Sequence, residues 1–496
     1  MRSILVSVLP QLLCVAALCA PAHAQEPPPL PAAELAALRE ASLRVHKEVL
    51  TRRETYSTLR ELCRVAPKRL SGSPGAAAAV TWARQTMTRL GLEKVRLEPC
   101  VVPRWVRGQV EVLKLLEPAQ AAGPLPILAL GGSVATPEGG VTAEVIAVSS
   151  FEELTRRAAE AKGKIVLFNR PFSPTELSTF KGYGGAVGQR VRGASAAAKV
   201  GGVAAIVRSM TPNLDDVPHT GGMRYAEGVA KIPTAAVSTR GAERIASWLK
   251  RGPVRLHLRL DCRSLPDEES FNVVGELRGR ESPDEILVVG GHLDAWDVGE
   301  GAHDCGAGCA QSMVALATLK RLGLRPRRTI RCVLFMNEEN GLAGGRTYAA
   351  DHAAEMPKHV LALESDRGGF TPRGFTTDAN PRASAILRQI VGLIPSGGDR
   401  LLPGYGGADI SPMKRFGVVQ LGFLPDSQRY FDLHHTRIDT FDKVHWRELE
   451  LGTAAMATVL YGVAELKATL PRNPLPRPKD VETPQPTPTP TPSRAR

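Results

Sequence analysis

Histidine and carboxylate side chains follow three short apolar runs in the middle of the chain. The runs span residues 286–291, 329–336 and 359–365, and the polar residues directly after them are His292, Asn337-Glu338-Glu339 and Asp366. Short apolar runs of this kind are typical of buried parallel strands, whose carboxyl ends carry the functional groups of α/β proteins. The sequence therefore predicts a metal site at one edge of a sheet.

Further candidate ligands lie close to these strand ends or far downstream. His292 and Asp294 point the same way if their segment is strand-like, so Asp294 could accept the second ring N–H of His292. Asp304 precedes a segment, 306–322, whose apolar residues have helical spacing, which predicts a β-α-β crossover. His434 and His435 are adjacent, shortly before the last predicted helix.

These residue types suit zinc better than a site without metal. Glu338 and Glu339 would repel each other if they were buried without a cation. Two histidines and three carboxylates form the mixed nitrogen and oxygen set that zinc accepts. Five ligands are too many for one tetrahedral ion, but they suit two ions if one carboxylate bridges them. One glutamate of the pair is then left over as a general base.

The N-terminus predicts export. Arg2 precedes an apolar run, 4–20, and Ala22-His23-Ala24 fits the small-x-small rule for a cleavage site. We therefore expect residues 1–24 to be a removed signal peptide and the protein to be periplasmic or secreted. No later run of 18 apolar residues exists, so no membrane-spanning segment is expected.

Composition predicts an ordinary globular protein of two or three domains. The chain has 496 residues, of which 43% are hydrophobic and 23% charged, with a net charge of +13. The basic residues are scattered and aromatic residues make up only 5%, so we expect a solvated basic surface and no nucleic-acid partner. Six cysteines remain after the signal, and we expect no disulfide scaffold in so long a chain.

The order of elements predicts one domain interrupted by another. Residues 25–117 read as helices followed by strands, and 263–470 carry the candidate site and a final helix from Trp446. Between them, 118–262 read as a β-rich insert of short strands and Gly- and Pro-rich turns. His219, a lone histidine of this insert, is interpreted as structural or exposed. The Thr-Pro repeats of 471–496 predict a disordered tail.

At these residues the chain resembles the co-catalytic zinc exopeptidases of the aminopeptidase type. The resemblance covers roughly residues 40 to 468. The segments that carry it are RLSGSPG from Arg69, GLEKVRLEP from Gly91, TPEGGVTAEVIAVSSFEEL from Thr136, GKIVLFNRP from Gly163, HTGG from His219, KIPTA from Lys231, GGHLDAWDVGEG from Gly290, LGLRPRRTIR from Leu322, ESD from Glu364 and YFDLHHTRIDT from Tyr430. Family members are expected to have a mixed β-sheet sandwiched by helices, an α/β fold.

The resemblance assigns a role to each candidate. It implies that His292, Asp304 and Asp366 hold one zinc ion, that Asp304, Glu339 and His435 hold a second, and that Asp304 bridges them. It implies that Glu338 is the general base, that Asp294 supports a ligand, and that Asp409 contacts substrate. The insert resembles a protease-associated domain. Relatives of this kind hydrolyse unblocked dipeptides, commonly as homodimers.

One position departs from the family pattern. Cys305 follows Asp304, where the family usually has Asp or Asn. We interpret Cys305 as a silent small residue, ahead of an extra soft ligand and of an oxidation-sensitive thiol. The predicted function is an exported di-zinc exopeptidase that acts on dipeptides or short peptides. The alternatives are an aminopeptidase acting on longer peptides and, from another class, a non-catalytic binding protein on the same scaffold.

Overall fold

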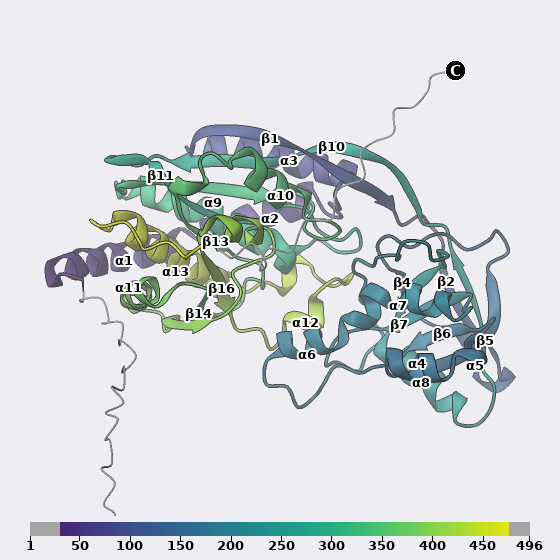
Figure 1. Cartoon of the computed structure of the whole chain (residues 1–496). Helices are drawn as coiled ribbons and strands as arrows, with labels where there is room; N and C mark the ends of the chain where they lie inside the picture. Colours follow the sequence, from purple (N-terminus) through teal and green to yellow (C-terminus); the bar gives the residue numbers. More distant parts are fainter. Residues whose placement is uncertain (1–29, 476–496) are drawn as a thin grey trace, which may run out of the picture.

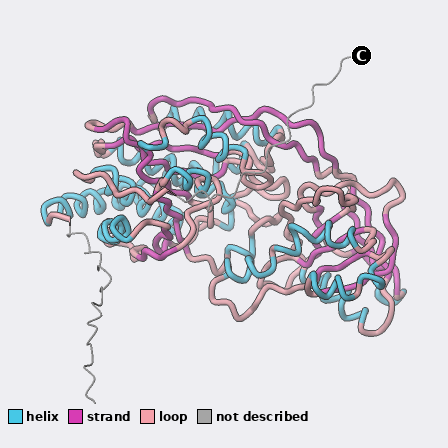
Figure 2. The backbone as a smooth tube through the Cα atoms, viewed as in Figure 1, coloured by secondary structure: helices cyan, strands magenta, loops and turns pink. Residues whose placement is uncertain are grey.

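The computed structural model describes residues 30–475, and two eight-stranded mixed sheets form its framework (Figures 1 and 2). The predicted signal peptide and most of the predicted tail lie outside the described residues. The first sheet has the strand order β1 (Glu93–Val106), β10 (Arg263–Leu277), β12 (Arg328–Phe335), β11 (Ser282–His292), β13 (His359–Glu364), β16 (Val419–Pro425), β14 (Pro372–Thr377) and β15 (Arg400–Pro403).

Four neighbouring strands at the centre of this sheet are parallel. They are β12, β11, β13 and β16. The pairs β1–β10, β10–β12 and β14–β16 are antiparallel, and the edge pair β14–β15 is parallel. Strands β11, β12 and β13 contain the three apolar runs of the sequence, and α9 (Ala307–Arg321) connects the first two. The predicted β-α-β unit is confirmed.

Helices cover both faces of the first sheet, because alternate strand residues point to opposite sides. On one face, Leu287 and Val289 of β11 join the core formed by helices α1 (Ala32–Arg52), α3 (Pro74–Arg89), α9, α11 (Pro381–Val391) and α13 (Trp446–Glu465). On the other face, Ile286 and Val288 pack with α10 (Ala343–Asp351). A further helix, α2 (Glu54–Val65), packs on α9. The predicted mixed α/β fold is confirmed.

Residues 111–260, called the second lobe below, build the second sheet. Its strand order is β3 (Gly123–Pro124), β2 (Glu111–Glu117), β9 (Arg255–Leu260), β5 (Val141–Val148), β6 (Ile165–Phe168), β7 (Ala204–Arg208), β8 (Thr234–Val237) and β4 (Ile127–Ala129). Its helices are α4 (Phe151–Arg156), α5 (Ala158–Ala161), α6 (Thr179–Ala186), α7 (Gly188–Lys199) and α8 (Thr239–Leu249). Strand β2 was predicted to end the first catalytic segment, but it pairs with β9 in the second sheet.

Two features join the lobes. The long antiparallel strands β1 and β10 run from the first sheet towards the second lobe (Figure 1). Between the lobes, aromatic residues of α6 pack on α12 (Tyr430–Leu433), which lies directly before the predicted metal ligand His435. Phe180 and Tyr183 of α6 both contact the ring of Phe431. The second lobe is therefore packed against the site and lies beside the segment that carries His435.

The described residues also give findings on disulfides and on membrane-spanning helices. All six cysteines of residues 30–475 are free and buried, so they form no disulfide among themselves. None of the helices in this part of the chain is long and apolar enough to cross a membrane.

Candidate metal centre

The carboxyl ends of three parallel strands bring the predicted ligands to one edge of the first sheet. In the register of β11 and β12, His292 lies opposite Phe335, the last residue before Met336-Asn337-Glu338-Glu339. In the register of β11 and β13, Gly290 lies opposite Glu364, two residues before Asp366. The sheet alone therefore places His292, Glu338, Glu339 and Asp366 side by side.

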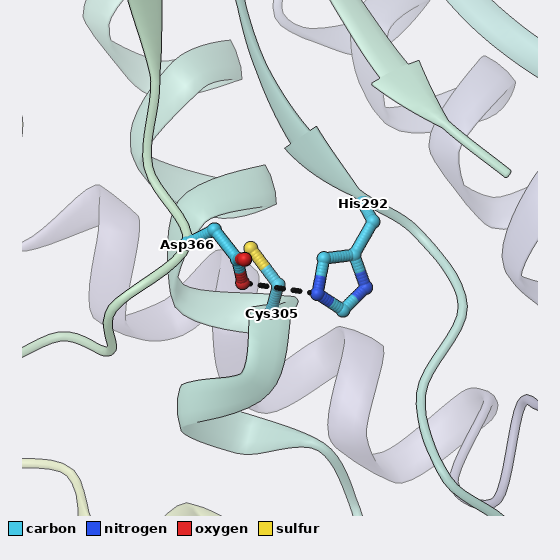
Figure 3. Close-up of side chains that lie close together, drawn as sticks. All are labelled: His292, Cys305 and Asp366. Atoms are coloured by element: carbon cyan, nitrogen blue, oxygen red, sulfur yellow. Dashed lines mark hydrogen bonds and ion pairs between the residues drawn. The ribbon is translucent and has the colours of Figure 1, made fainter. Parts of the chain in front are cut away.

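His292, Asp304 and Asp366 form the first of two connected groups. The Nε2 atom of His292 is 3.1 Å from Oδ1 of Asp304 and 3.0 Å from Oδ1 of Asp366. Figure 3 shows the imidazole of His292 facing the carboxylate of Asp366, with the sulfur of Cys305 next to them. Three ligand-bearing side chains thus converge from a strand end, a helix start and a second strand end.

Asp304, Glu339 and His435 form the second group. Nε2 of His435 is 3.3 Å from Oδ2 of Asp304 and 3.1 Å from Oε2 of Glu339. Nε2 of His434 lies 3.8 Å from Oδ2 of Asp304, and its ring stacks on that of His435 with centroids 3.5 Å apart. Asp304 therefore belongs to both groups, with Oδ1 in the first and Oδ2 in the second. Of the two histidines, His435 lies closer to Oδ2 than His434 does.

Two carboxylate oxygens in this centre are buried without any hydrogen-bond partner in the described residues. They are Oδ2 of Asp304 and Oε1 of Glu339, on side chains that are almost fully buried. A buried charge without a partner is costly, and a cation removes that cost. The buried carboxylates and imidazoles of both groups therefore fit metal ions, and their oxygen and nitrogen donors suit zinc.

Burial and neighbouring charges together raise the pKa values of Glu338, Glu339 and His435 in this centre. Burial and, after it, the charge of Asp304 raise the pKa of Glu339 to about 7. Burial also raises the pKa of Glu338 well above its usual value, against the opposing charge of His292. Burial lowers the pKa of His435, but the carboxylates of Glu339 and Asp304 outweigh it and bring the value to about 9. Without metal, the protein thus retains protons that bound cations would displace.

The contacts of Asp294 differ from the expected ones. The Nδ1 atom of His292 lies 3.0 Å from the main-chain oxygen of Asp294, whereas the carboxylate of Asp294 is 3.8 Å away. That carboxylate instead accepts the main-chain N–H groups of Asn337, Glu338 and Glu339, at 2.8, 3.0 and 3.3 Å. The backbone of Asp294 orients the His292 ring, and its side chain fixes the segment that carries both glutamates.

Two residues that sequence reasoning did not single out hold the loop around Asp304. The carboxylate of Asp439 accepts the main-chain N–H groups of His303 and Asp304, at 2.9 and 3.1 Å. The buried guanidinium of Arg69 donates to the carbonyl oxygens of Leu293, Glu300 and Gly301. Arg69 opens a segment that the family resemblance includes, and Asp439 follows His435 in the His-Thr-x-x-Asp pattern.

The second lobe also contacts the centre, through Thr220. The main-chain N–H of Thr220 donates to the carbonyl of His435 at 2.9 Å, and Nδ1 of His435 lies 3.3 Å from the carbonyl of Thr220. These bonds support His435 in a left-handed conformation with φ of 62°. His219, interpreted from the sequence as structural or exposed, is buried, with neither ring nitrogen bonded among the described residues.

The side chains of Asp409 and Cys305 are both buried. Asp409 is 0% exposed, and neither of its carboxylate oxygens has a partner in the described part of the chain. Its predicted contact with substrate stays a prediction. The thiol of Cys305 donates to the carbonyl of Ser365 at 2.8 Å. Cys305 is therefore occupied as a donor, although its sulfur is close enough to His292 and Asp366 to belong to the same ligand cluster.

A cavity of about 470 Å³ opens beside the centre, between the two lobes. Glu338 and Glu339 line it from the first lobe, and Arg190 and Gly222 line it from the second. Glu338 is half-buried, so its carboxylate is accessible from this space. The arrangement places a basic carboxylate between a metal-binding cluster and a cavity large enough for a small peptide.

Comparison with known proteins identifies the family of this centre. Residues 272–460 match Peptidase family M28, and they contain every predicted metal ligand. Carboxypeptidase Q of Mus musculus is 39% identical over 421 residues, which cover 84% of this chain and 87% of the relative. The chain belongs to peptidase family M28. This M28 chain is therefore a metallopeptidase, and the resemblance seen in the sequence is confirmed.

Solved structures of M28 peptidases agree with the fold. The crystal structure of a peptidase M28 precursor from Shewanella amazonensis is 35% identical, with a TM-score of 0.85, and covers 89% of this chain and 100% of the other. The zinc aminopeptidase BSAP from Bacillus subtilis is 19% identical, with a TM-score of 0.61, and covers 85% of this chain and 97% of the other. The second likeness concerns the fold alone.

Proposed function

We propose that this M28 chain is an exported exopeptidase that uses two zinc ions to hydrolyse dipeptides or short peptides. The proposal rests on Asp304, because its two carboxylate oxygens face two different histidines, His292 and His435. A carboxylate placed in this way can bridge two cations. The leader around Arg2 supports export, and the similarity to carboxypeptidase Q supports exopeptidase activity.

In the proposed centre, His292, Asp304 and Asp366 hold one ion, and Asp304, Glu339 and His435 hold the other. Glu339 and His435 are assigned to the second ion because Oε2 of Glu339 and Nε2 of His435 approach each other, at 3.1 Å. Zinc bound here would polarise the scissile carbonyl and lower the pKa of water. Asp294 and Asp439 keep the ligand segments in place through the main-chain bonds described above.

Glu338 is the proposed general base. Its carboxylate accepts a proton from the attacking water while the water oxygen bonds to the carbonyl carbon of the substrate. The C–N bond then breaks, and Glu338 returns the proton to the leaving amine, so that a carboxylic acid and an amine are released. Burial raises the pKa of Glu338, and a carboxylate with a raised pKa is a stronger base for accepting the proton of the water.

Two substitutions test these assignments. Glu338→Ala removes the base but no ligand, so we expect dipeptide turnover to fall at least about 1000-fold while the zinc content stays at that of the wild type. Asp304→Ala removes the bridge, so both turnover and zinc content should fall. Wild-type turnover by the Glu338→Ala protein would refute the role of Glu338.

A further inference from the structure

Arg190 is a buried cation that the proposed hydrolysis does not use. It lies on α7 of the second lobe and is only 7% exposed. Its Nε atom has no hydrogen-bond partner, and no ion pair among residues 30–475 includes its guanidinium. Burying a guanidinium without an acidic partner is costly unless an anion binds to it.

The nearest site group does not supply an acceptor. Nη1 of Arg190 lies 3.4 Å from Nδ1 of His435. Because Nε2 of His435 faces the carboxylates of Asp304 and Glu339, Nδ1 carries the ring hydrogen and points it at the carbonyl of Thr220, 3.3 Å away. A protonated Nδ1 cannot accept from Arg190, so the guanidinium remains available to a ligand.

The surroundings of Arg190 hold it in one place. Gly221 has φ of 138°, and a Cβ atom there would lie 2.3 Å from Nη1, so the absence of a side chain allows the backbone to pack on the guanidinium. On another side, the Arg190 Cζ atom is 5.5 Å from the ring centroid of Tyr183, which itself packs on Phe431. A guanidinium fixed in this way is suited to binding a carboxylate with a defined orientation.

Arg190 shares the 470 Å³ cavity with Glu338. Since Glu338 is the proposed donor of a proton to the leaving amine, the residue that leaves must lie on the Glu338 side of the centre. Arg190 adjoins His435, a proposed ligand of the metal centre, and one residue spans only about 3.3–3.6 Å. We therefore infer that Arg190 faces the main chain of the residue directly after the scissile bond. The anionic group that the main chain of such a residue offers is a terminal α-carboxylate.

We propose that Arg190 binds the free α-carboxylate of the leaving residue and thereby restricts the enzyme to substrates that end one residue after the scissile bond. The inference rests on the proposed function and deepens it. Dipeptides and peptides that lose a single C-terminal residue satisfy this restriction. A longer chain beyond the scissile bond presents a neutral peptide group to Arg190, so removal of an N-terminal residue from long peptides is disfavoured.

The test compares a dipeptide with its C-terminal amide on the zinc-loaded, full-length protein. For the wild type we expect kcat/KM to be roughly 10- to 100-fold higher for the free acid, the range expected for loss of one charge-assisted hydrogen bond. Arg190→Met should lower kcat/KM for the free acid by about 10- to 100-fold more than it lowers kcat/KM for the amide, so that the preference for the acid disappears. Arg190→Lys, which keeps the charge but not the planar fork, should give an intermediate preference.

Arg192→Met is the matched control, because Arg192 lies on the same helix but is exposed and stacks over Phe151, with Cζ 5.2 Å from the ring centroid. It should retain the wild-type preference. Equal cleavage of acid and amide by the wild type overturns the inference even if Arg190→Met does not fold. Equal losses on both substrates in Arg190→Met and Arg190→Lys also overturn it. If the wild type cleaves no peptide at all, the proposed function itself fails, which is a different result.

Discussion

Replacing Asp294 by Asn tests whether a buried carboxylate positions the catalytic segment. In the wild type, Oδ1 accepts the N–H groups of Asn337 and Glu338, and Oδ2 accepts that of Glu339. An amide oxygen can keep the first two bonds as neutral ones, but the amide NH₂ then faces the N–H of Glu339. Charge-assisted bonds contribute about 1.5–3 kcal/mol and neutral ones about 0.5–1.5, so weakening two bonds and losing the third costs roughly 3.5–6 kcal/mol.

Most of this loss is offset, because burial raises the pKa of Asp294 in spite of its three hydrogen bonds and so makes its charge costly in the folded state. We therefore expect the free energy of unfolding to fall by only about 1–2 kcal/mol in Asp294→Asn. Activity should fall more, about 10- to 100-fold in kcat/KM, because Glu338 and Glu339 both lose their support. The effect on function should thus exceed the effect on stability.

The assay is dipeptide turnover at saturating zinc, with zinc content and urea unfolding measured on the same samples. Asp351→Asn, at the exposed end of α10, is a control with the same chemical change. It should match the wild type in all three measurements. Wild-type turnover by Asp294→Asn at full zinc content would refute the idea that this carboxylate positions the catalytic segment.

The remaining predictions concern pH, the thiol and metal removal. Burial raises the pKa of Glu450 to about 7, so between about pH 4.5 and 7 the folded state holds a proton that the unfolded state has released. The free energy of unfolding should therefore fall by up to about 3 kcal/mol as the pH rises across that window. In urea unfolding, Glu450→Gln should show a smaller decline. Cys305→Ser keeps a donor to Ser365, so turnover should stay within about threefold and zinc affinity unchanged, whereas a loss of more than about tenfold in zinc affinity would make Cys305 a ligand. Dialysis against a chelator should abolish turnover and lower the unfolding temperature, and added zinc should restore both.

The sequence predicts the first sheet well where its patterns are local. Strands β11, β12 and β13 are continuous apolar runs followed by polar residues, and the register of parallel strands then brings the polar residues together. The predicted boundary after residue 117 leaves β2 in the first catalytic segment, whereas β2 pairs with β9 in the second sheet. An alternating strand at a boundary can pair with either sheet, and only its partner decides between them.

The rest of the site depends on contacts between distant segments. The role of the Asp294 side chain follows from the backbone path after β12, which no spacing rule gives. The approach of Arg190 and Thr220 to His435 results from packing of α6 against α12, two helices in different parts of the chain. Arg190 carries no motif, and its burial without an acidic partner, seen within residues 30–475, is a feature of the tertiary structure.

The most direct test of the two-ion centre is the number of zinc ions that the metal-free protein binds. That number is measured by calorimetric titration with zinc and by elemental analysis of the zinc-loaded protein. The bridging position of Asp304 predicts about two ions per chain, with full dipeptide turnover only after the second ion binds. Asp304→Ala should bind fewer ions under the same conditions. Full turnover with one zinc ion per chain would contradict the account.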